Sequence, residues 1–331
     1  MNIYREKSYI MAPIAGYSDW PFRKAIRKLG CHYAFTQMID AGSLVWGMKC
    51  KRRRLNGKNT LFMHRAPEEE WLGIQLLGND PDLLEEAVEI INERNYDVLD
   101  LNMGCPVRKV IKRQCGAKLA EDEILARKCL EKMVKKSKIP VTAKIRILDI
   151  DDPEPSVYLA LELEKAGISA LTVHGRTRSA IYSGSTHYNI IREISNALTI
   201  PVIVNGGIMS TADAQIARDK SKCDSAMIAR GAIGNPWIFK ELYNEKTVIP
   251  TPEQLCNQIE EHINDIIDFY GEEIGMKISR KILLSYLMGR GYRGEYRNNA
   301  GRIKTMDEFN IFMKLIRSKG PDKRYIKKHR L

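Results

Sequence analysis

Short apolar runs alternate with amphipathic stretches over the first 240 or so residues of the chain. Most of these runs are continuous rather than alternating, as is typical of parallel strands buried on both faces. They predict eight strands, at Tyr9–Ala15, Tyr33–Ile39, Leu72–Leu77, Val98–Leu101, Val141–Ile147, Ala170–His174, Val202–Asn205 and Ala226–Ala229.

Between the runs, apolar residues recur every three or four positions, which is the spacing of amphipathic helices. Asp19 before Pro21 and Asp80 before Pro81 favour helix starts. The predicted helices are Asp19–Gly30, Asp82–Arg94, Glu121–Lys136, Ser156–Ala166, Tyr188–Asn196 and Thr211–Arg218. This α/β alternation predicts a (β/α)8 TIM barrel. A doubly wound open sheet is the alternative, but no strand–GxGxxG–helix unit occurs near the start.

A different pattern follows the segment Val248–Pro252, which is typical of a linker. The predicted helices Glu253–Tyr270, Lys277–Met288 and Asp307–Arg317 have no strand between them. We therefore expect a catalytic barrel over residues 1–247 and a small all-α helical-bundle domain over residues 253–331, with a disordered tail from residue 320 onward.

Composition excludes several classes of protein. With 44% hydrophobic and 28% charged residues among 331, the chain is neither disordered, collagen-like nor a coiled coil. It has no apolar run of about 18 residues and no secretory signal, so we expect no membrane association. The seven cysteines never form a C-x-x-C pair, which favours reduced thiols in the cytoplasm over disulfides or a metal site.

Charge is concentrated at one end of the chain. The net charge is +12, and residues 276–331 hold 16 basic against 4 acidic residues, while the remainder is balanced at 37 of each. This asymmetry indicates a segment that binds a polyanion, attached to a neutral core. A basic tail that only improves solubility is the alternative interpretation.

Polar residues interrupt several predicted strands near their carboxyl ends, where barrels of this type carry their active sites. Lys144 lies inside an apolar strand and needs an anion or an electron-rich partner, such as a flavin or a neighbouring barrel acid.

Glycines after the seventh and eighth strands, with Arg230, fit a phosphate site, although they also suit tight turns. Cys105 lies between Gly104 and Pro106, which would aim its thiol into the barrel mouth; alone, it would be an inert buried cysteine.

Seven segments together resemble the tRNA-dihydrouridine synthases, a family of flavin-dependent enzymes that reduce uridine in tRNA. They occur in the family's order and include the very specific N-M-G-C-P followed by G-A-K-L. The segments are Met11–Arg23, Gly73–Pro81, Leu99–Leu119, Val141–Ile147, His174–Arg178, Pro201–Ile208 and Ala229–Phe239.

This resemblance implies FMN in the barrel mouth and NADPH, or NADH, as the reductant. It implies that Cys105 is the general acid that protonates C5 of the uracil, after hydride reaches C6 from N5 of the flavin. The implied flavin-binding residues are Pro13, Ile14, Gln75, Lys144, His174, Asn205, Gly207, Arg230 and Gly231. Asn102 and Arg176 would lie near the uracil.

A uridine must leave its stack before it can be reduced, so the enzyme must also hold a folded RNA by its backbone. The helical domain would supply basic residues for this, namely Lys277, Arg280, Lys281, Arg290, Arg293, Arg297 and Arg302. Lys49–Arg54, Arg108, Lys109, Lys112 and Arg113 would flank the barrel mouth. Any one of these residues could instead be ordinary solvated surface.

The sequence departs from the family at Ser185–Tyr188, at Ile282 and at Gly289–Gly294, which leaves the target uridine open. We expect tRNA as the partner, with no obligate protein partner. Two other functions remain as alternatives: a small-molecule flavin oxidoreductase of the dihydroorotate or dihydropyrimidine dehydrogenase type, and a non-catalytic RNA-binding protein.

Overall fold

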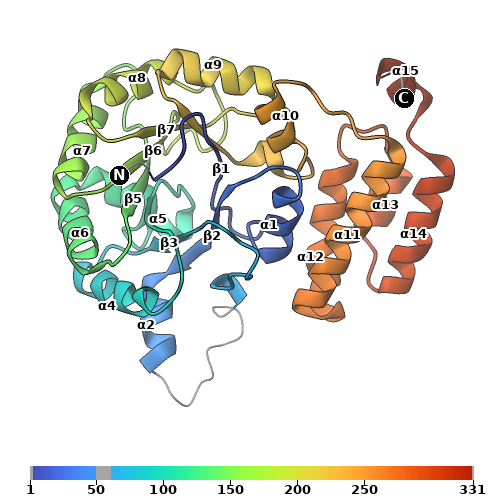
Figure 1. Ribbon diagram of the computed structural model, residues 1–331, viewed down its shortest axis with the longest axis horizontal. Coiled ribbons are helices and arrows are strands. Elements are labelled where there is room, and N and C mark those ends of the chain that lie inside the picture. Colours follow the sequence, from blue (N-terminus) through green and yellow to red (C-terminus); the bar gives the residue numbers. More distant parts are fainter. Residues whose placement is uncertain (1–2, 50–60, 330–331) are drawn as a thin grey trace. The chain divides into compact units, whose positions relative to one another are not determined.

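Eight parallel strands close into a barrel in the computed structural model, which describes residues 3–49 and 61–329 (Figure 1). Each strand pairs with the next along the chain, and β8 pairs with β1. The strands are β1 (Tyr9–Met11), β2 (Tyr33–Asp40), β3 (Leu72–Leu77), β4 (Val98–Met103), β5 (Val141–Arg146), β6 (Ala170–His174), β7 (Val202–Asn205) and β8 (Ser225–Ile228). The predicted (β/α)8 barrel is confirmed.

Strand β1 is shorter than the predicted Tyr9–Ala15. Beyond Met11 the chain turns, and the carbonyl oxygen of Ile14 accepts hydrogen bonds from the backbone N–H groups of Tyr17 and Ser18. The Ser18 hydroxyl in turn accepts from the N–H of Ile14, at 2.9 Å. The segment that looks like a continuation of the strand is therefore a turn at the carboxyl end of the barrel.

Helices surround the strands, as Figure 1 shows for α4 and for α6 to α9. They are α2 (Ala41–Lys49), α4 (Pro81–Asn92), α5 (Arg108–Ile111), the 3₁₀ turn η1 (Gly116–Glu121), α6 (Glu123–Lys136), α7 (Glu154–Lys165), α8 (Tyr188–Ala197) and α9 (Thr211–Ser221). The Asp80 carboxylate caps α4 by accepting from the N–H groups of Asp82 and Leu83, as its position before Pro81 predicts. Helix α2 is absent from our predictions because Trp46 and Met48 are apolar but exposed, so the sequence shows no clear separation of an apolar and a polar face.

The amino end of the barrel interior is filled by aromatic and aliphatic side chains. Tyr4, Tyr33 and Phe35 pack with Trp71, and the ring centroids of Tyr33 and Trp71 are 5.2 Å apart. This plug closes the amino end of the barrel, which leaves the carboxyl end for polar residues.

A second compact unit consists of Trp20–Cys31 and Arg230–Leu331, and the barrel unit comprises Met1–Asp19 and His32–Ala229. Within the described residues, the second unit is helical and contains no strand. Its elements are α1 (Trp20–Arg27), the 3₁₀ turn η2 (Arg230–Ala232), α10 (Ile238–Asn244), α11 (Pro252–Tyr270), α12 (Glu272–Leu287), α13 (Glu295–Ala300), α14 (Met306–Lys319) and α15 (Lys323–His329). The expected helical C-terminal region is thus present, while the boundaries at 247 and 253 stay a prediction.

Helix α11 carries five acidic residues and no basic one, and its acids bind basic residues of two other helices. Lys24 on α1 lies 2.5 Å from Asp265, and Lys28, just after α1, pairs with Glu261. Arg317 on α14 lies 2.6 Å from Glu260. Ion pairs within this unit therefore neutralise part of its acidic charge.

The expected disordered tail is wrong for residues 323–329, which form α15. Asp322 caps this helix by accepting from the N–H of Tyr325, and its own N–H donates to the carbonyl of Gly291. Gly291 has a φ of +78°, and a Cβ there would lie 2.7 Å from the Cβ of Tyr325. This close contact explains how a short basic segment is held as a helix.

Among residues 3–49 and 61–329, no helix combines the length and the apolar character that crossing a membrane requires.

Candidate functional site

Polar side chains from neighbouring strands meet inside the barrel near its carboxyl end. The strand register aligns Gln75 with Asp100 and Asn102 with Lys144. It also aligns His174 with Asn205 across β6 and β7. Five of these six side chains are at least nine-tenths buried, and Lys144 is partly buried. The barrel thus gathers the predicted residues of β3 to β7 at one end.

Hydrogen bonds connect the residues of β3 and β4 into one chain. The buried Asp100 carboxylate accepts from Nε2 of Gln75 and from the hydroxyl of Thr142, each at 2.7 Å. The other end of the Gln75 amide, Oε1, accepts from Nδ2 of Asn102 at 2.8 Å. Burial raises the pKa of Asp100 to about 6, although the two hydrogen bonds oppose this shift.

Asn102 holds the turn that carries Cys105. Its Oδ1 accepts from the backbone N–H groups of Gly104, at 3.2 Å, and of Cys105, at 3.0 Å. Arg146 supports the same turn, because its Nε donates to the carbonyl of Gly104 at 2.8 Å. The carbonyl of Cys105 accepts from the N–H of Ala117 at 3.1 Å, so the turn is fixed from three sides.

Burial raises the pKa of the Cys105 thiol above its usual value, while the N–H of Val107 and the cations Arg146 and Lys144 oppose the shift. A raised pKa keeps the thiol protonated near neutral pH. Such a group is suited to donate a proton rather than to act as a nucleophile.

Lys144 lies next to this turn with a neutral partner. Its Nζ donates to Oδ1 of Asn205 at 2.9 Å, and Nδ2 of Asn205 donates to the carbonyl of Met227. Burial lowers the pKa of Lys144 to about 7; Arg146 adds to the shift and Asp100 opposes it. A buried ammonium group held by an amide rather than a carboxylate is well placed to interact with a ligand that takes on negative charge.

The loop after β7 approaches its neighbours very closely. Gly206 and Gly207 have φ values of +109° and +75°. A Cβ on Gly206 would lie 2.5 Å from the His174 ring, and one on Gly207 would lie 2.8 Å from Oγ1 of Thr186 and 2.9 Å from the Tyr188 hydroxyl. Only glycine allows this backbone path, and it leaves hydroxyl groups beside the loop where a phosphate site is predicted.

Arg176 is buried and stabilises the loop between β6 and α8. It donates to the carbonyl oxygens of Ser183 and Gly184 at 3.0 to 3.1 Å, and its Nη1 lies 3.4 Å from Nε2 of His174. Pro13 and Ile14 are partly exposed in the turn after β1, with Ile14 against the barrel core. The expected roles of these residues toward uracil and flavin stay predictions.

Arg230 and Gly231 form η2 at the start of the second unit. They follow β8 after one intervening residue, Ala229, as a phosphate-binding turn would. Their part in a phosphate site remains a prediction.

Four of the seven basic residues predicted to touch RNA in the second unit differ in their surroundings. Lys277 is exposed and pairs with Glu273 at 2.9 Å, and Arg293 is exposed with Asp322 at 3.4 Å. Arg280 donates from Nε to the carbonyl of Ile303 at 2.7 Å. Lys281 is partly buried.

The guanidinium group of Arg290 bonds groups of the second unit itself. It donates to the carbonyl oxygens of Gly234 and Tyr286 and lies over the ring of Trp237. Burial lowers its pKa from the usual value.

Near the barrel mouth, Arg108, Lys109 and Lys112 are exposed on or beside α5, whereas Arg113 pairs with Asp40 at 2.5 Å. Of the predicted run from residue 49 to 54, only Lys49 lies within the described residues.

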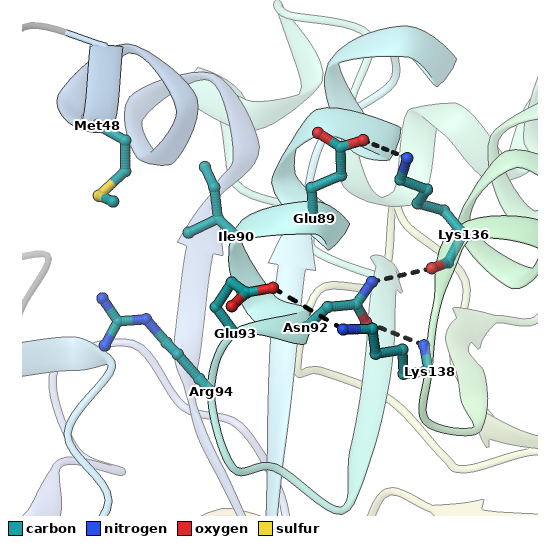
Figure 2. Close-up of a pocket in the computed structure, with 8 residues that line it drawn as sticks. All are labelled: Met48, Glu89, Ile90, Asn92, Glu93, Arg94, Lys136 and Lys138. Atoms are coloured by element: carbon teal, nitrogen blue, oxygen red, sulfur yellow. Dashed lines mark hydrogen bonds and ion pairs between the residues drawn. The ribbon is translucent and has the colours of Figure 1, made fainter.

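Figure 2 shows a cavity of about 740 Å³ near the carboxyl end of α4. Several of its polar groups pair with one another: Glu89 pairs with Lys136, and the Asn92 amide bonds the carbonyl of Lys136 and the N–H of Lys138, each at 2.9 Å. Since α4 leads back to the start of β4, this cavity lies at the amino end of the barrel, away from Cys105.

Three residues of the site were not assigned a role from sequence, namely Asp100, Thr142 and Arg146. All three lie in segments that we singled out, and their side chains alternate along β4 and β5 with buried aliphatic residues. That alternation is the signal that could have identified them as facing the barrel interior.

Known proteins resemble this chain along most of its length. The family described as dihydrouridine synthase (Dus) matches residues 10–319. The tRNA-dihydrouridine synthase B of Pasteurella multocida (strain Pm70) is 35% identical over 292 residues, or 86% of each chain. The enzyme of that name from Pseudomonas aeruginosa is 36% identical over 304 residues, covering 90% of this chain and 89% of that one. A probable tRNA-dihydrouridine synthase of Rickettsia prowazekii (strain Madrid E) is 34% identical over 309 residues, 92% of each.

Proposed function

The chain belongs to the dihydrouridine synthase family, and from that premise we propose that it reduces uridine in tRNA to 5,6-dihydrouridine. The observation that carries this proposal is the Cys105 thiol, whose pKa is raised by burial, on a turn fixed beside a polar barrel mouth. Such a thiol can deliver a proton to a carbon atom of a base held in the mouth.

The residues at the mouth fit a flavin mononucleotide. Pro13 and Ile14 would pack against its ring, while Lys144 and His174 would bind its polar edge, together with Gln75. The phosphate would be held by Asn205, Gly207, Arg230 and Gly231. The fit rests on two features of the barrel: an ammonium group with a neutral partner, and a glycine loop without room for side chains.

FMN in this site, reduced by NADPH or NADH, would supply the hydride that passes from its N5 to C6 of the uracil. Cys105 then gives its proton to C5, and the thiolate regains a proton from solvent. Hydride and proton together saturate the C5–C6 bond, and no other bond of the base changes. Lys144, whose pKa is lowered to about 7, would stabilise negative charge that develops beside it.

We further propose that the second unit binds the backbone of the tRNA. Its acidic helix α11 is partly bound to α1 and α14, whereas α13 to α15 expose basic residues. On these helices and the segments that join them, the exposed basic residues not bound to α11 are Arg293, Arg297, Arg302, Lys304, Lys314, Lys319, Lys323, Arg324, Lys327 and Lys328. A surface of this kind suits a phosphate backbone, and the target uridine would be extruded to reach Cys105. Among the described cysteines, Cys105, Cys115, Cys129, Cys223 and Cys256 form no disulfide, in keeping with a reducing compartment such as the cytoplasm.

The proposal is tested with the purified protein and unmodified tRNA. The protein should be yellow, NADPH should bleach the flavin absorption, and dihydrouridine should appear in the RNA. Reduction of a free pyrimidine instead of tRNA would favour the small-molecule oxidoreductase. RNA binding by a protein that takes up no flavin would favour the non-catalytic alternative. Mapping of dihydrouridine in cells with and without the gene would then identify the target uridines.

A further inference from the structure

Asp100 is a buried carboxylate with no part in the proposed chemistry, and both of its hydrogen-bond donors are neutral side chains. It accepts from Gln75 and Thr142 at 2.7 Å each and is 2% exposed. Burial of a carboxylate costs free energy unless hydrogen bonds or opposite charges compensate for the lost hydration.

The carboxylate sets the orientation of two amides in succession. An ionised carboxylate only accepts hydrogen bonds, so it must meet the NH₂ end of Gln75. That leaves Oε1 of Gln75 as the acceptor for Nδ2 of Asn102. Asn102 is then oriented with Oδ1 toward the Cys105 turn, where it accepts two backbone N–H groups.

Reversal of either amide would break this chain. A flipped Gln75 would present its oxygen to the carboxylate and its NH₂ to the NH₂ of Asn102. A flipped Asn102 would face the N–H groups of Gly104 and Cys105 with its own donors and release the turn. The orientation at the turn therefore depends on a residue two hydrogen bonds away.

We propose that Asp100 is a positioning residue, whose carboxylate acts through Gln75 and Asn102 on the turn that carries the thiol. Its task is to hold the Cys105 thiol at one place in the barrel mouth. The link to uridine reduction rests on the proposed function, but the link to the turn does not. An alternative role for Asp100 is to neutralise Lys144, which the test separates.

Two substitutions of Asp100 distinguish these roles. Asp100→Asn removes the charge but keeps an acceptor for Gln75, since the Thr142 hydroxyl can rotate to accept the new N–H. Asp100→Leu keeps the branched arrangement of the side chain, with two larger methyl groups in place of the oxygens, and offers no acceptor. Thr142→Val is the matched control, because it costs the carboxylate one hydrogen bond and leaves the bond to Gln75 intact.

The first measurement is amide hydrogen exchange of the flavin-free protein in the peptide that spans Met103–Val107. Exchange at Gly104 and Cys105 should be about tenfold faster in Asp100→Leu, because the population of the opened turn rises. Asp100→Asn and Thr142→Val should exchange as the wild type does. This readout needs neither RNA nor activity, so it stands even if the protein proves not to reduce uridine.

The second measurement is uridine reduction by the loaded enzyme. Asp100→Leu should lower kcat on the order of 100-fold, with KM for the RNA little changed, because only the proton donor is displaced. Asp100→Asn should restore kcat to within a few fold of the wild type. Equal losses in Asp100→Asn and Asp100→Leu would assign Asp100 to charge neutralisation and overturn the proposal.

If Asp100→Leu does not fold, Gln75→Met removes the middle of the chain instead. The same faster exchange at Gly104 and Cys105 is expected in the flavin-free protein. Wild-type exchange rates there would show that the turn is held without this chain of bonds, which contradicts the proposal.

Discussion

The barrel mouth and the second unit use charged residues in opposite ways. In the mouth, the buried Asp100 and the partly buried Lys144 are bonded at fixed distances to neutral groups. In the second unit, most basic residues of α13 to α15 are exposed. Buried groups act through direction and hydrogen-bond pattern, whereas exposed ones act through summed charge. Mutations in the two regions should therefore affect different measurements.

The largest expected effect is at Cys105. Cys105→Ala should lower uridine reduction by roughly 10²- to 10⁴-fold, since a general acid is removed, and should leave flavin uptake and reduction by NADPH unchanged. Single-turnover oxidation of the reduced enzyme by tRNA measures this. Cys115→Ala is the matched control, because this buried thiol lies in the adjoining turn. Full activity in Cys105→Ala would remove the thiol from the mechanism.

The second effect concerns RNA affinity. Changing Arg324, Lys327 and Lys328 on α15 to Gln should weaken tRNA binding roughly tenfold at low salt. The dependence of log affinity on log salt should become shallower by up to about 0.9 for each phosphate that the variant no longer neutralises. Flavin reduction should be unaffected. Lys128, Lys135 and Lys138, exposed on α6 of the barrel or just after it, provide three matched substitutions. Equally weakened binding in that variant would show that total charge, and not α15, determines the affinity.

These two regions differ in how far the sequence predicts them. The apolar runs indicated the strands, and Gly104 and Pro106 around Cys105 indicated the thiol turn, because both patterns are local. The role of Asp100 depends on which strand lies beside which, and that is known only once the barrel closes. In the second unit, basic composition was clear, but Arg280 and Arg290 prove to bond carbonyl groups of their own unit. Composition does not reveal such internal bonds.

A third effect concerns pH and a buried histidine in the second unit. Burial lowers the pKa of His262 to about 3, and its Nδ1 lies 3.0 Å from the Tyr286 hydroxyl. Below pH 6.5 the unfolded chain binds a proton here that the folded chain does not. The free energy of unfolding should therefore fall as pH decreases from 6.5, by at most about 1.4 kcal/mol per pH unit. Urea unfolding between pH 7 and 5 measures the slope.

Asp100 should give the free energy of unfolding the opposite dependence on pH. Its pKa is raised to about 6, so between pH 3.8 and 6 the folded chain holds a proton that the unfolded chain releases, and stability falls as pH rises. His262→Gln should remove the first slope and Asp100→Asn the second. An unchanged slope in His262→Gln would show that other groups set the acid sensitivity.

The smallest effect is expected at an ion pair of the second unit. Lys24→Gln breaks the contact with Asp265 and should cost only about 0.2–1 kcal/mol of unfolding free energy, less at high salt. A double-mutant cycle with Asp265→Asn isolates the pair. A coupling well above this range would mean that charges of the second unit also act through fixed geometry, as those of the barrel mouth do.

The partnership of α1 with α11 has a consequence during synthesis. Lys24 and Asp265 are 241 residues apart in the chain. At roughly 5–20 residues per second, α1 leaves the ribosome about 10 to 50 s before its partner helix exists. The apolar face that includes Phe22 and Ile26 lacks α11 throughout that interval. Helix α1 of the second unit therefore lacks its packing partner until α11 is made, and this stage is where chaperone binding and proteolysis should concentrate.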